Sequence, residues 1–387
     1  MIYLDAAATS AVRGEVLEAM WPYLTGSFGN PSSHHELGES AALALADARA
    51  TVAALFGARP SEVIFTAGGT ESDNLAVKGI ALANPRGRHI VTSAVEHEAV
   101  LESCDYLRRI HGFEISIVGV DRHGLVDPDE VAKLLRPDTT LVSIILTNNE
   151  VGAVQPIRAI AELAHAVGAV MHTDAVQAAG WIDLKDLGAD AISVSGHKLG
   201  APKGIGALYL RRRIPLEPLV HGGGQERGRR SGTENVAGAV GLATAVRLSE
   251  LARVDHADRV TALRDTFIAD VVSAVPGATL TGPTEPRLPS NASFCFPGTS
   301  GESILLELGQ RGVVCSAGSA CAVGSDEPSH VLVAMGIEPE VAQTAVRFSM
   351  DATITAEQLQ QVVRHLVDAS QTVHALGAST TTATAAP

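Results

Sequence analysis

The chain has 387 residues, and its 46% of hydrophobic and 19% of charged residues are typical of a folded globular protein. Its 29 basic and 43 acidic residues give a formal net charge of −14, which argues against non-specific binding to nucleic acid or to an anionic membrane surface. The first residues lack a basic segment followed by an apolar one, and no apolar run approaches the roughly 18 residues of a membrane span, so we expect a cytoplasmic protein without nucleic-acid or membrane partners.

Between residues 63 and 210, short apolar runs alternate with stretches whose apolar residues recur at helical spacing. Strands are predicted at 63–66, 89–93, 114–120, 140–146, 169–174, 191–195 and 206–210, with helices at 39–56, from the glycine loop 67–74 through 83, and at 99–111, 128–135 and 157–167. This alternation predicts an α/β fold in which a mostly parallel seven-stranded sheet is sandwiched by helices. Ligands of such sheets bind beyond the carboxyl ends of the strands.

A loop rich in glycine and arginine follows at 221–235, and a long alanine-rich helix is predicted over 236–275. This helix leads to a smaller α+β domain with strands at 291–296 and 312–315. The predicted units are a large domain over 14–255, a small domain made of 1–13 and 256–375, and a disordered low-complexity tail over 376–387.

One lysine stands at the end of a predicted strand. The apolar run 191–195 stops at Ser195-Gly-His-Lys198, and a turn rich in glycine follows. Such a loop holds an amine where a carbonyl can reach it, and amines of this kind form Schiff bases, above all with pyridoxal phosphate (PLP). A lysine in this position is also often a solvated strand cap, and the short motif alone does not decide between the two.

A PLP site also needs phosphate donors and an anion beside the pyridine nitrogen. Gly68-Gly69-Thr70 opens a predicted helix, whose first N–H groups and positive dipole end suit a phosphate. Asp174 ends the apolar strand 169–174, where a carboxylate would keep the pyridine nitrogen protonated. Both features are equally compatible with ordinary helix N-caps.

Further polar residues follow other strand ends. Gln177 lies three residues after Asp174 and would reach the phenolic oxygen of the cofactor. His97, between two glutamates, would stack on the ring or pass protons, although a solvated loop histidine has the same local sequence. Asn148 and Asn149 end another strand with amides that suit a ligand.

The four cysteines include no Cys-x-x-Cys pair, so neither a disulfide framework nor a zinc site is indicated. Cys104, Cys295 and Cys315 have large apolar neighbours and are predicted to be core residues. Cys321 lies instead among small and polar residues, as in an exposed loop where a thiolate is free to react. We therefore predict Cys321 to be a second nucleophile.

Taken together, these segments follow one another in the order found in a known family. They are Leu4-Asp-Ala-Ala-Ala-Thr9, Gly29-Asn-Pro-Ser-Ser33, Gly69-Thr-Glu-Ser72, Glu96-His97, Asn148-Asn-Glu150, Asp174-Ala-Val-Gln177, Ser195-Gly-His-Lys198, Arg230-Ser-Gly-Thr-Glu-Asn235, Ser319-Ala-Cys321 and Arg347-Phe-Ser349. Over about residues 2–350 the chain resembles the PLP-dependent cysteine desulfurases (NifS/IscS-like), which are related to class V aminotransferases and have the PLP fold-type I architecture.

The resemblance implies a role for each candidate. Lys198 would hold PLP covalently, and His97 would stack on its ring. The implied cofactor-binding residues are Gly69, Thr70, His97, Asn149, Asp174, Gln177, Ser195, His197, Lys198 and Thr233, with no metal. In the family, a threonine at the position of Thr233 reaches the phosphate of the other subunit, which implies a homodimer. Asn149 and Arg347 would hold the carboxylate of the substrate.

The implied reaction converts L-cysteine to L-alanine, with Cys321, Lys198 and His97 as the catalytic residues. Lys198 would take the Cα proton, and His97 would handle the proton of the substrate thiol. The thiolate of Cys321 would attack the substrate sulfur and become a persulfide. The sulfur would then pass to an acceptor protein, either an iron–sulfur scaffold or a thiolation protein.

The long spacing after Cys321 is similar to that of the housekeeping and nitrogen-fixation subgroup, which feeds iron–sulfur assembly. The chain departs from the family pattern after Arg347, where Met350-Asp351 replaces a glycine-containing continuation. Its tail also does not resemble the segment with which some relatives dock a scaffold. Two other functions are compatible with the fold: a different PLP enzyme, such as a selenocysteine lyase or an aminotransferase, and a degenerate member kept as a binding or sulfur-carrier partner.

Overall fold

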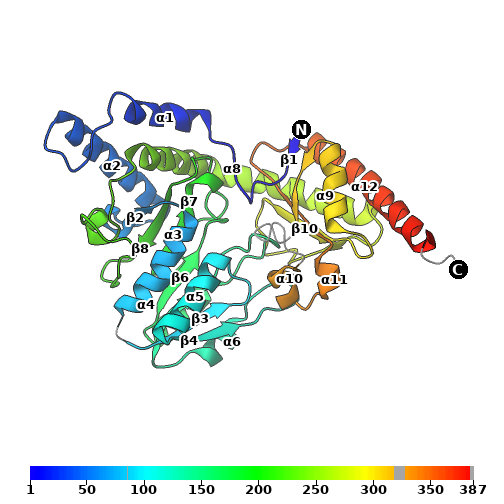
Figure 1. Ribbon diagram of the computed structural model, residues 1–387, viewed down its shortest axis with the longest axis horizontal. Helices are drawn as coiled ribbons and strands as arrows, with labels where there is room; N and C mark the ends of the chain where they lie inside the picture. Colours follow the sequence, from blue (N-terminus) through cyan, green and yellow to red (C-terminus); the bar gives the residue numbers. More distant parts are fainter. Residues whose placement is uncertain (85, 318–326, 384–387) are drawn as a thin grey trace.

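The computed structural model (Figure 1) describes residues 1–84, 86–317 and 327–383. Its larger sheet has seven strands in the order β2-β8-β7-β6-β5-β3-β4. They are β2 (Val63–Thr66), β3 (His89–Ser93), β4 (Glu114–Val118), β5 (Thr139–Ser143), β6 (Val170–Asp174), β7 (Ala191–Ser195) and β8 (Gly206–Leu210). Strand β8 is antiparallel to both of its neighbours and the other pairs are parallel, which confirms the predicted mostly parallel sheet.

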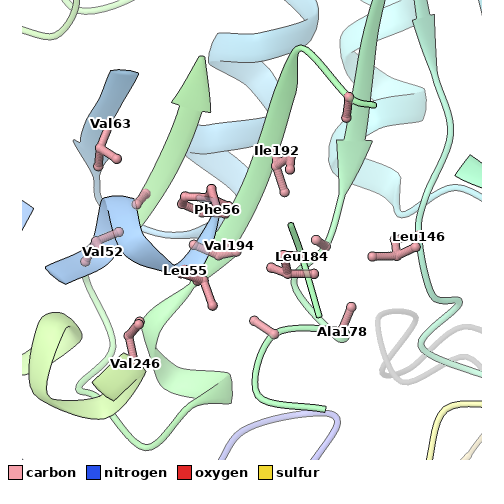
Figure 2. Close-up of a cluster of buried hydrophobic side chains, with 14 of the residues drawn as sticks. Val52, Leu55, Phe56, Val63, Leu146, Ala178, Leu184, Ile192, Val194 and Val246 are labelled. Atoms are coloured by element: carbon pink, nitrogen blue, oxygen red, sulfur yellow. The ribbon is translucent and has the colours of Figure 1, made fainter. Parts of the chain in front are cut away.

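Helices cover both faces of this sheet, because successive side chains on each strand point to opposite sides. The first face is covered by α3 (Gly69–Asn74), a π-helical turn (Leu75–Gly79), α4 (Ile80–Ala83) and α5 (Glu98–His111). The second face is covered by α2 (Glu36–Leu55), α6 (Pro128–Leu134), α7 (Ile157–Ala166) and the first half of α8 (Val236–Ala274). Figure 2 shows part of this second core, where Leu55 of α2 lies beside Val194 of β7.

A second, antiparallel sheet lies at the other end of the molecule. Its order is β12-β13-β10-β9, formed by β9 (Thr279–Leu280), β10 (Asn291–Cys295), β12 (Ser316–Ala317) and β13 (Ala345–Ser349). The helices of this part are α9 (Gly301–Gln310), α10 (His330–Ala334), α11 (Pro339–Ala342) and α12 (Ala356–Ala383). Its core contains the edge-to-face rings of Phe267, Phe294 and Phe348, which are all buried.

The N-terminal residues belong to this second part. Strand β1 (Ile2–Tyr3) pairs in parallel with β11 (Val313–Val314), and the backbone of Ser349 donates to the carbonyl of Leu4 at 2.8 Å. Helix α8 crosses between the parts: Val246 belongs to the core of the large sheet, whereas Val260 belongs to that of the small one. The boundaries 14–255, 1–13 and 256–375 themselves stay a prediction.

Two helical segments differ from the expectation. Helix α1 (Gly14–Leu24) was not predicted, and α12 continues to Ala383 through most of the segment that we expected to be disordered from residue 376. The first part of α12 buries Leu359, Val362 and Leu366 at helical spacing. Because extending a formed helix costs much less than nucleating one, this packed part allows the helix to continue over the alanine- and threonine-rich sequence.

The glycine- and arginine-rich loop 221–235 is held to the large sheet by a buried ion pair. Arg49 of α2 donates to both carboxylate oxygens of Glu226, at 2.5 and 2.7 Å, and lies over the ring of Phe65. Glu226 also accepts the backbone N–H of Phe65 at 3.1 Å. Because the two charges are buried and joined by two hydrogen bonds, the pair fixes the loop against β2.

We predict that Glu226→Ala lowers the free energy of unfolding by roughly 3–5 kcal/mol, because the guanidinium of Arg49 is then buried without its partner. The double variant Arg49→Met/Glu226→Met loses much less, since both charges leave together. Denaturant unfolding of the full chain measures both. A loss below about 1 kcal/mol for Glu226→Ala, the range of an exposed ion pair, would contradict this assignment.

Candidate active site

A narrow glycine turn joins β2 to α3. Gly68 has a φ of +155°, a conformation that favours glycine, and a Cβ on Gly69 would lie 2.7 Å from the side chain of Val176 and 3.4 Å from that of Ser195. The turn therefore brings the start of α3 against the end of β7. The backbone N–H groups at Gly69 and Thr70 and the hydroxyl of Ser195 form a cradle of donors that suits a phosphate.

A carboxylate lies at the end of β6. Asp174 is buried, and its Oδ1 accepts the backbone N–H of Val176 at 2.8 Å. Burial raises the pKa of Asp174, while His97 and Lys198 are close enough for their charges to lower it. His97 is the N-cap of α5, and its Nδ1 accepts the N–H of Ala99 at 3.0 Å, so neutral His97 carries its proton on Nε2.

Lys198 and Gln177 lie against the N-terminal segment. The Nζ of Lys198 donates to the carbonyls of Ala7 and, at 2.8 Å, of Ala8, and the amide of Gln177 also donates to Ala7, at 3.0 Å. Both side chains line a cavity of about 430 Å³ whose wall includes Trp181. The lysine that we predicted from the strand end therefore faces a hollow beside Gln177, near the carboxylate of Asp174.

His197 is also part of this arrangement. Its Nδ1 lies 3.1 Å from the hydroxyl of Thr9, and its carbonyl accepts the hydroxyl of Ser10 at 2.7 Å. Burial, followed by the charges of Lys198 and Lys203, lowers the pKa of His197 to about 4. A neutral His197 therefore acts as a hydrogen-bonding group and not as a charge.

Arg347 brings a guanidinium from the small sheet to the same region. Its side chain is 1% exposed, and it donates to the carbonyl of Asn149 at 3.1 Å and to Asp5 at 2.9 Å. Its Nε has no hydrogen-bond partner within the part of the chain that the structure describes. A buried guanidinium with a spare donor suits an anionic ligand. It is the backbone of Asn149, and not its amide, that contacts Arg347.

Among the described residues, Thr233 is a predicted site residue that is not brought to this group. Thr233 is exposed on the loop 221–235, which Arg230 ties to α3 through Glu71, with Nε at 2.9 Å from the carboxylate. Cys321 lies outside the described residues. The described chain before it ends in β12, where Ser316 is the strand partner of Arg347.

The other three cysteines are structural. Cys104 and Cys295 are buried and Cys315 is half-buried. Burial raises the pKa of their thiols to about 12, 11 and 12, respectively, so all three stay protonated. No cluster of three or more His, Cys, Asp or Glu side chains among the described residues suits a metal ion. None of the described helices combines the length and apolar content that a membrane crossing requires.

The structure also shows a buried acid that sequence reasoning passed over. Glu150 follows Asn149, is 5% exposed, and accepts the hydroxyl of Ser329 at 2.5 Å. Burial raises its pKa to about 7, although Ser329 and the charge of Arg347 lower it. The signal was its place after two strand-end asparagines, but sequence alone does not distinguish a buried glutamate from a solvated one.

This geometry is that of a PLP enzyme, and comparison with known proteins gives its family. A family model described as "Aminotransferase class-V" matches residues 2–362. The chain is 46% identical over 378 residues to "Cysteine desulfurase IscS" of Dictyoglomus turgidum, covering 96% of both chains. It is 46% identical over 366 residues to the protein of that name from Methanosarcina thermophila, covering 94% of this chain and 90% of the relative.

Solved structures agree with this result. A structure described as "NIFS-LIKE PROTEIN" superposes with a TM-score of 0.89 at 37% identity, covering 95% of this chain and 98% of that one. "SspA in complex with cysteine" superposes with a TM-score of 0.79 at 36% identity, covering 90% and 99%. The chain belongs to the class-V aminotransferase family and, within it, to the cysteine desulfurases.

The raised pKa of Glu150 predicts a pH-dependent stability. Its carboxyl titrates near 4.5 in the unfolded chain and near 7 in the folded one, so between these values the folded state binds more protons. The free energy of unfolding of the wild type, relative to that of Glu150→Gln, therefore falls as pH rises from 4.5 to 7, by up to roughly 3 kcal/mol. Denaturant unfolding at a series of pH values measures it. The control variant is Glu36→Gln, because Glu36 is exposed. If the difference in unfolding free energy between wild type and Glu150→Gln stays constant with pH, the carboxyl of Glu150 does not have the raised pKa.

Proposed function

We propose that the chain is a PLP-dependent cysteine desulfurase that converts L-cysteine to L-alanine and carries the sulfur as a persulfide on Cys321. The observation that carries the proposal is the position of Lys198, which lies beside a cavity, Gln177 and the buried carboxylate of Asp174. Asp174 and Gln177 come from the end of β6 and Lys198 follows β7, and each of the three has a chemical counterpart in PLP.

The residues present fit the cofactor. The close approach at Gly69 leaves no room for a side chain, so backbone N–H groups and the hydroxyl of Ser195 are the donors for the phosphate, together with Thr70 and His197. Asp174 would offer a buried carboxylate to the pyridine nitrogen, Gln177 would offer an amide to the phenolic oxygen, and His97 would stack on the ring. When bound, PLP withdraws electrons from the substrate α-carbon.

The chain's own groups then handle the protons and the sulfur. Arg347 and Asn149 hold the substrate carboxylate, and Lys198 takes the α-proton. His97 takes the proton of the substrate thiol. The thiolate of Cys321 attacks the substrate sulfur: an S–S bond forms, the C–S bond breaks, and its electron pair remains with the carbon, which is then protonated. The products are alanine and Cys321 persulfide, and no external oxidant or reductant is needed.

We further propose that the enzyme is a cytoplasmic homodimer whose subunits share their sites. Leu17, Trp21 and Leu24 form one stripe along α1 and are 54%, 66% and 60% exposed. Such an apolar stripe is costly in water and suits a second copy of the chain. The exposed Thr233 on the loop 221–235 would then complete the phosphate site of the partner. The persulfide would pass to an iron–sulfur scaffold or a thiolation protein.

The reaction is tested by incubating the purified full chain with L-cysteine and PLP. We predict equal amounts of alanine and transferred sulfur, and a Cys321 peptide heavier by one sulfur atom. Cys321→Ser abolishes sulfur transfer, whereas the control Cys104→Ser retains it because that buried thiol takes no part. Full sulfide release by Cys321→Ser would instead favour a different PLP chemistry, and absence of a PLP-bound Lys198 would favour a non-enzymatic role.

The dimer is tested by charging the stripe on α1. We predict that Leu17→Glu/Trp21→Glu converts the dimer to a monomer by light scattering and weakens PLP binding, since each site then lacks the partner's threonine. The control is Leu306→Glu. Leu306 is 65% exposed and belongs to α9, which lies far from α1 (Figure 1). A charged variant that remains dimeric, or a wild type that is monomeric, would contradict the shared site.

A further inference from the structure

One face of the large sheet changes character along its strands. The side chains that point toward α3, α4 and α5 are apolar near the start of the strands, where Leu141 and Val170 belong to the core of that face. Two residues later on the same face come Ser143 and His172, which are strand partners, and Ser193 of β7 is the strand partner of Asp174. Ser143, His172 and Ser193 therefore form a patch of buried polar side chains next to Asp174 in the sheet.

His172 is the centre of this patch. It is 0% exposed, its Nδ1 lies 2.8 Å from the hydroxyl of Ser143, and its Nε2 lies 3.0 Å from that of Ser193. Burial lowers its pKa to about 3, so the ring is neutral. In a neutral imidazole one nitrogen donates and the other accepts. One of the two serines therefore donates to the ring and the other accepts from it. The position of the ring proton, on Nδ1 or on Nε2, decides which serine donates.

Asp73 of α3 reaches the same patch from above the sheet. It is 2% exposed, its Oδ1 has no hydrogen-bond partner within the described chain, and that oxygen lies 3.7 Å from Nε2 of His172. Burial raises the pKa of Asp73, the charges of Asp174 and Glu96 raise it further, and the neighbouring hydroxyl of Ser193 lowers it. These are the charged and hydrogen-bonding groups that face it from β6, β7 and the loop before α5.

Asp73 and Asp174 form a buried pair of carboxyls in which ionisation of one disfavours ionisation of the other. Asp174 has the better environment for a negative charge, because it accepts the N–H of Val176 and its pKa is lowered by charge at His97 and Lys198. Asp73 has none of these partners. The shared proton therefore belongs to Asp73.

We propose that Asp73 is a positioning residue that stays protonated at neutral pH and, through Ser193, His172 and Ser143, leaves Asp174 as the ionised member of the pair. The inference rests on the proposed function, since it assigns Asp174 to the pyridine nitrogen of PLP. It adds a defined direction to the hydrogen bonds: Asp73 donates to Ser193, Ser193 donates to Nε2 of His172, and Nδ1–H donates to Ser143. An ionised Asp73 would reverse all three.

The tautomer of His172 therefore reports the protonation of Asp73. Nitrogen NMR of the full chain labelled in histidine, with PLP bound and with His172→Gln to assign the signal, distinguishes Nδ1–H from Nε2–H. The expected result is Nδ1–H in both wild type and Asp73→Asn, because the asparagine amide replaces the acid as donor. An Nε2–H signal in the wild type would overturn the proposal.

The equilibrium affinity for PLP gives a second measurement. Asp73→Asn is neutral like the protonated acid, so its dissociation constant for PLP should stay within about twofold of the wild type. Asp73→Ala removes the donor to Ser193 and should weaken PLP about tenfold, the effect of one buried hydrogen bond. The matched control is Asp47→Asn, at an exposed position on α2. Equal weakening by the asparagine and alanine variants would show that the charge is needed and would overturn the proposal.

Neither measurement uses L-cysteine. If the wild type binds PLP and has the Nδ1–H tautomer but forms no alanine, the proposed reaction fails and the inference about Asp73 stands. If alanine and the persulfide form while the tautomer is Nε2–H, the inference fails and the reaction stands.

Discussion

The site depends on one constraint, which is that parallel strands of a sheet end at the same edge. Strands β2, β6 and β7 deliver the Gly68–Gly69 turn, Asp174 and Ser195 to that edge, although more than 100 residues separate the first from the last. The loop after β3 adds His97, and the turn after β7 adds Lys198. Substitutions can therefore alter the carboxylate, the lysine or the phosphate cradle separately, because the buried strands that position them are unaffected.

Arg347 shows how the second part of the molecule completes this edge. The guanidinium belongs to the small sheet, yet its partners are Asp5 and the carbonyl of Asn149. The N-terminal segment pairs with β11 through β1, contacts Ser349 of the small sheet through Leu4, and also accepts the hydrogen bonds of Lys198 and Gln177. A buried charge requires such partners, so the same segment links the substrate-binding arginine to the lysine.

The strand-end residues could be read from the sequence because apolar runs followed by polar residues have a direct structural meaning. Lys198, Asp174 and Gln177 were predicted in this way, and the structure brings them together. Partnerships across the chain have no such local signal. Asp5 with Arg347, Glu226 with Arg49 and Asp73 with His172 join residues 99 or more positions apart, and no periodicity marks them. Helix α1 escaped prediction for a related reason, since it lies on α8 and leaves Trp21 exposed.

Several buried acids near the carboxyl edge of the large sheet have too few cationic partners to offset the cost of burying their charge. Glu96, Glu150, Asp73 and Asp174 all have raised pKa values, with burial as the largest cause in each. Because the charges of Glu96 and Asp174 raise the pKa of Asp73, and that of Asp174 raises the pKa of Glu96, these three carboxyls disfavour one another's ionisation. In our proposal the carboxylate that stays ionised is Asp174, because the charges of His97 and Lys198 lower its pKa. Burial of the surrounding acids thus concentrates the negative charge of the edge at the position where a protonated pyridine nitrogen needs it.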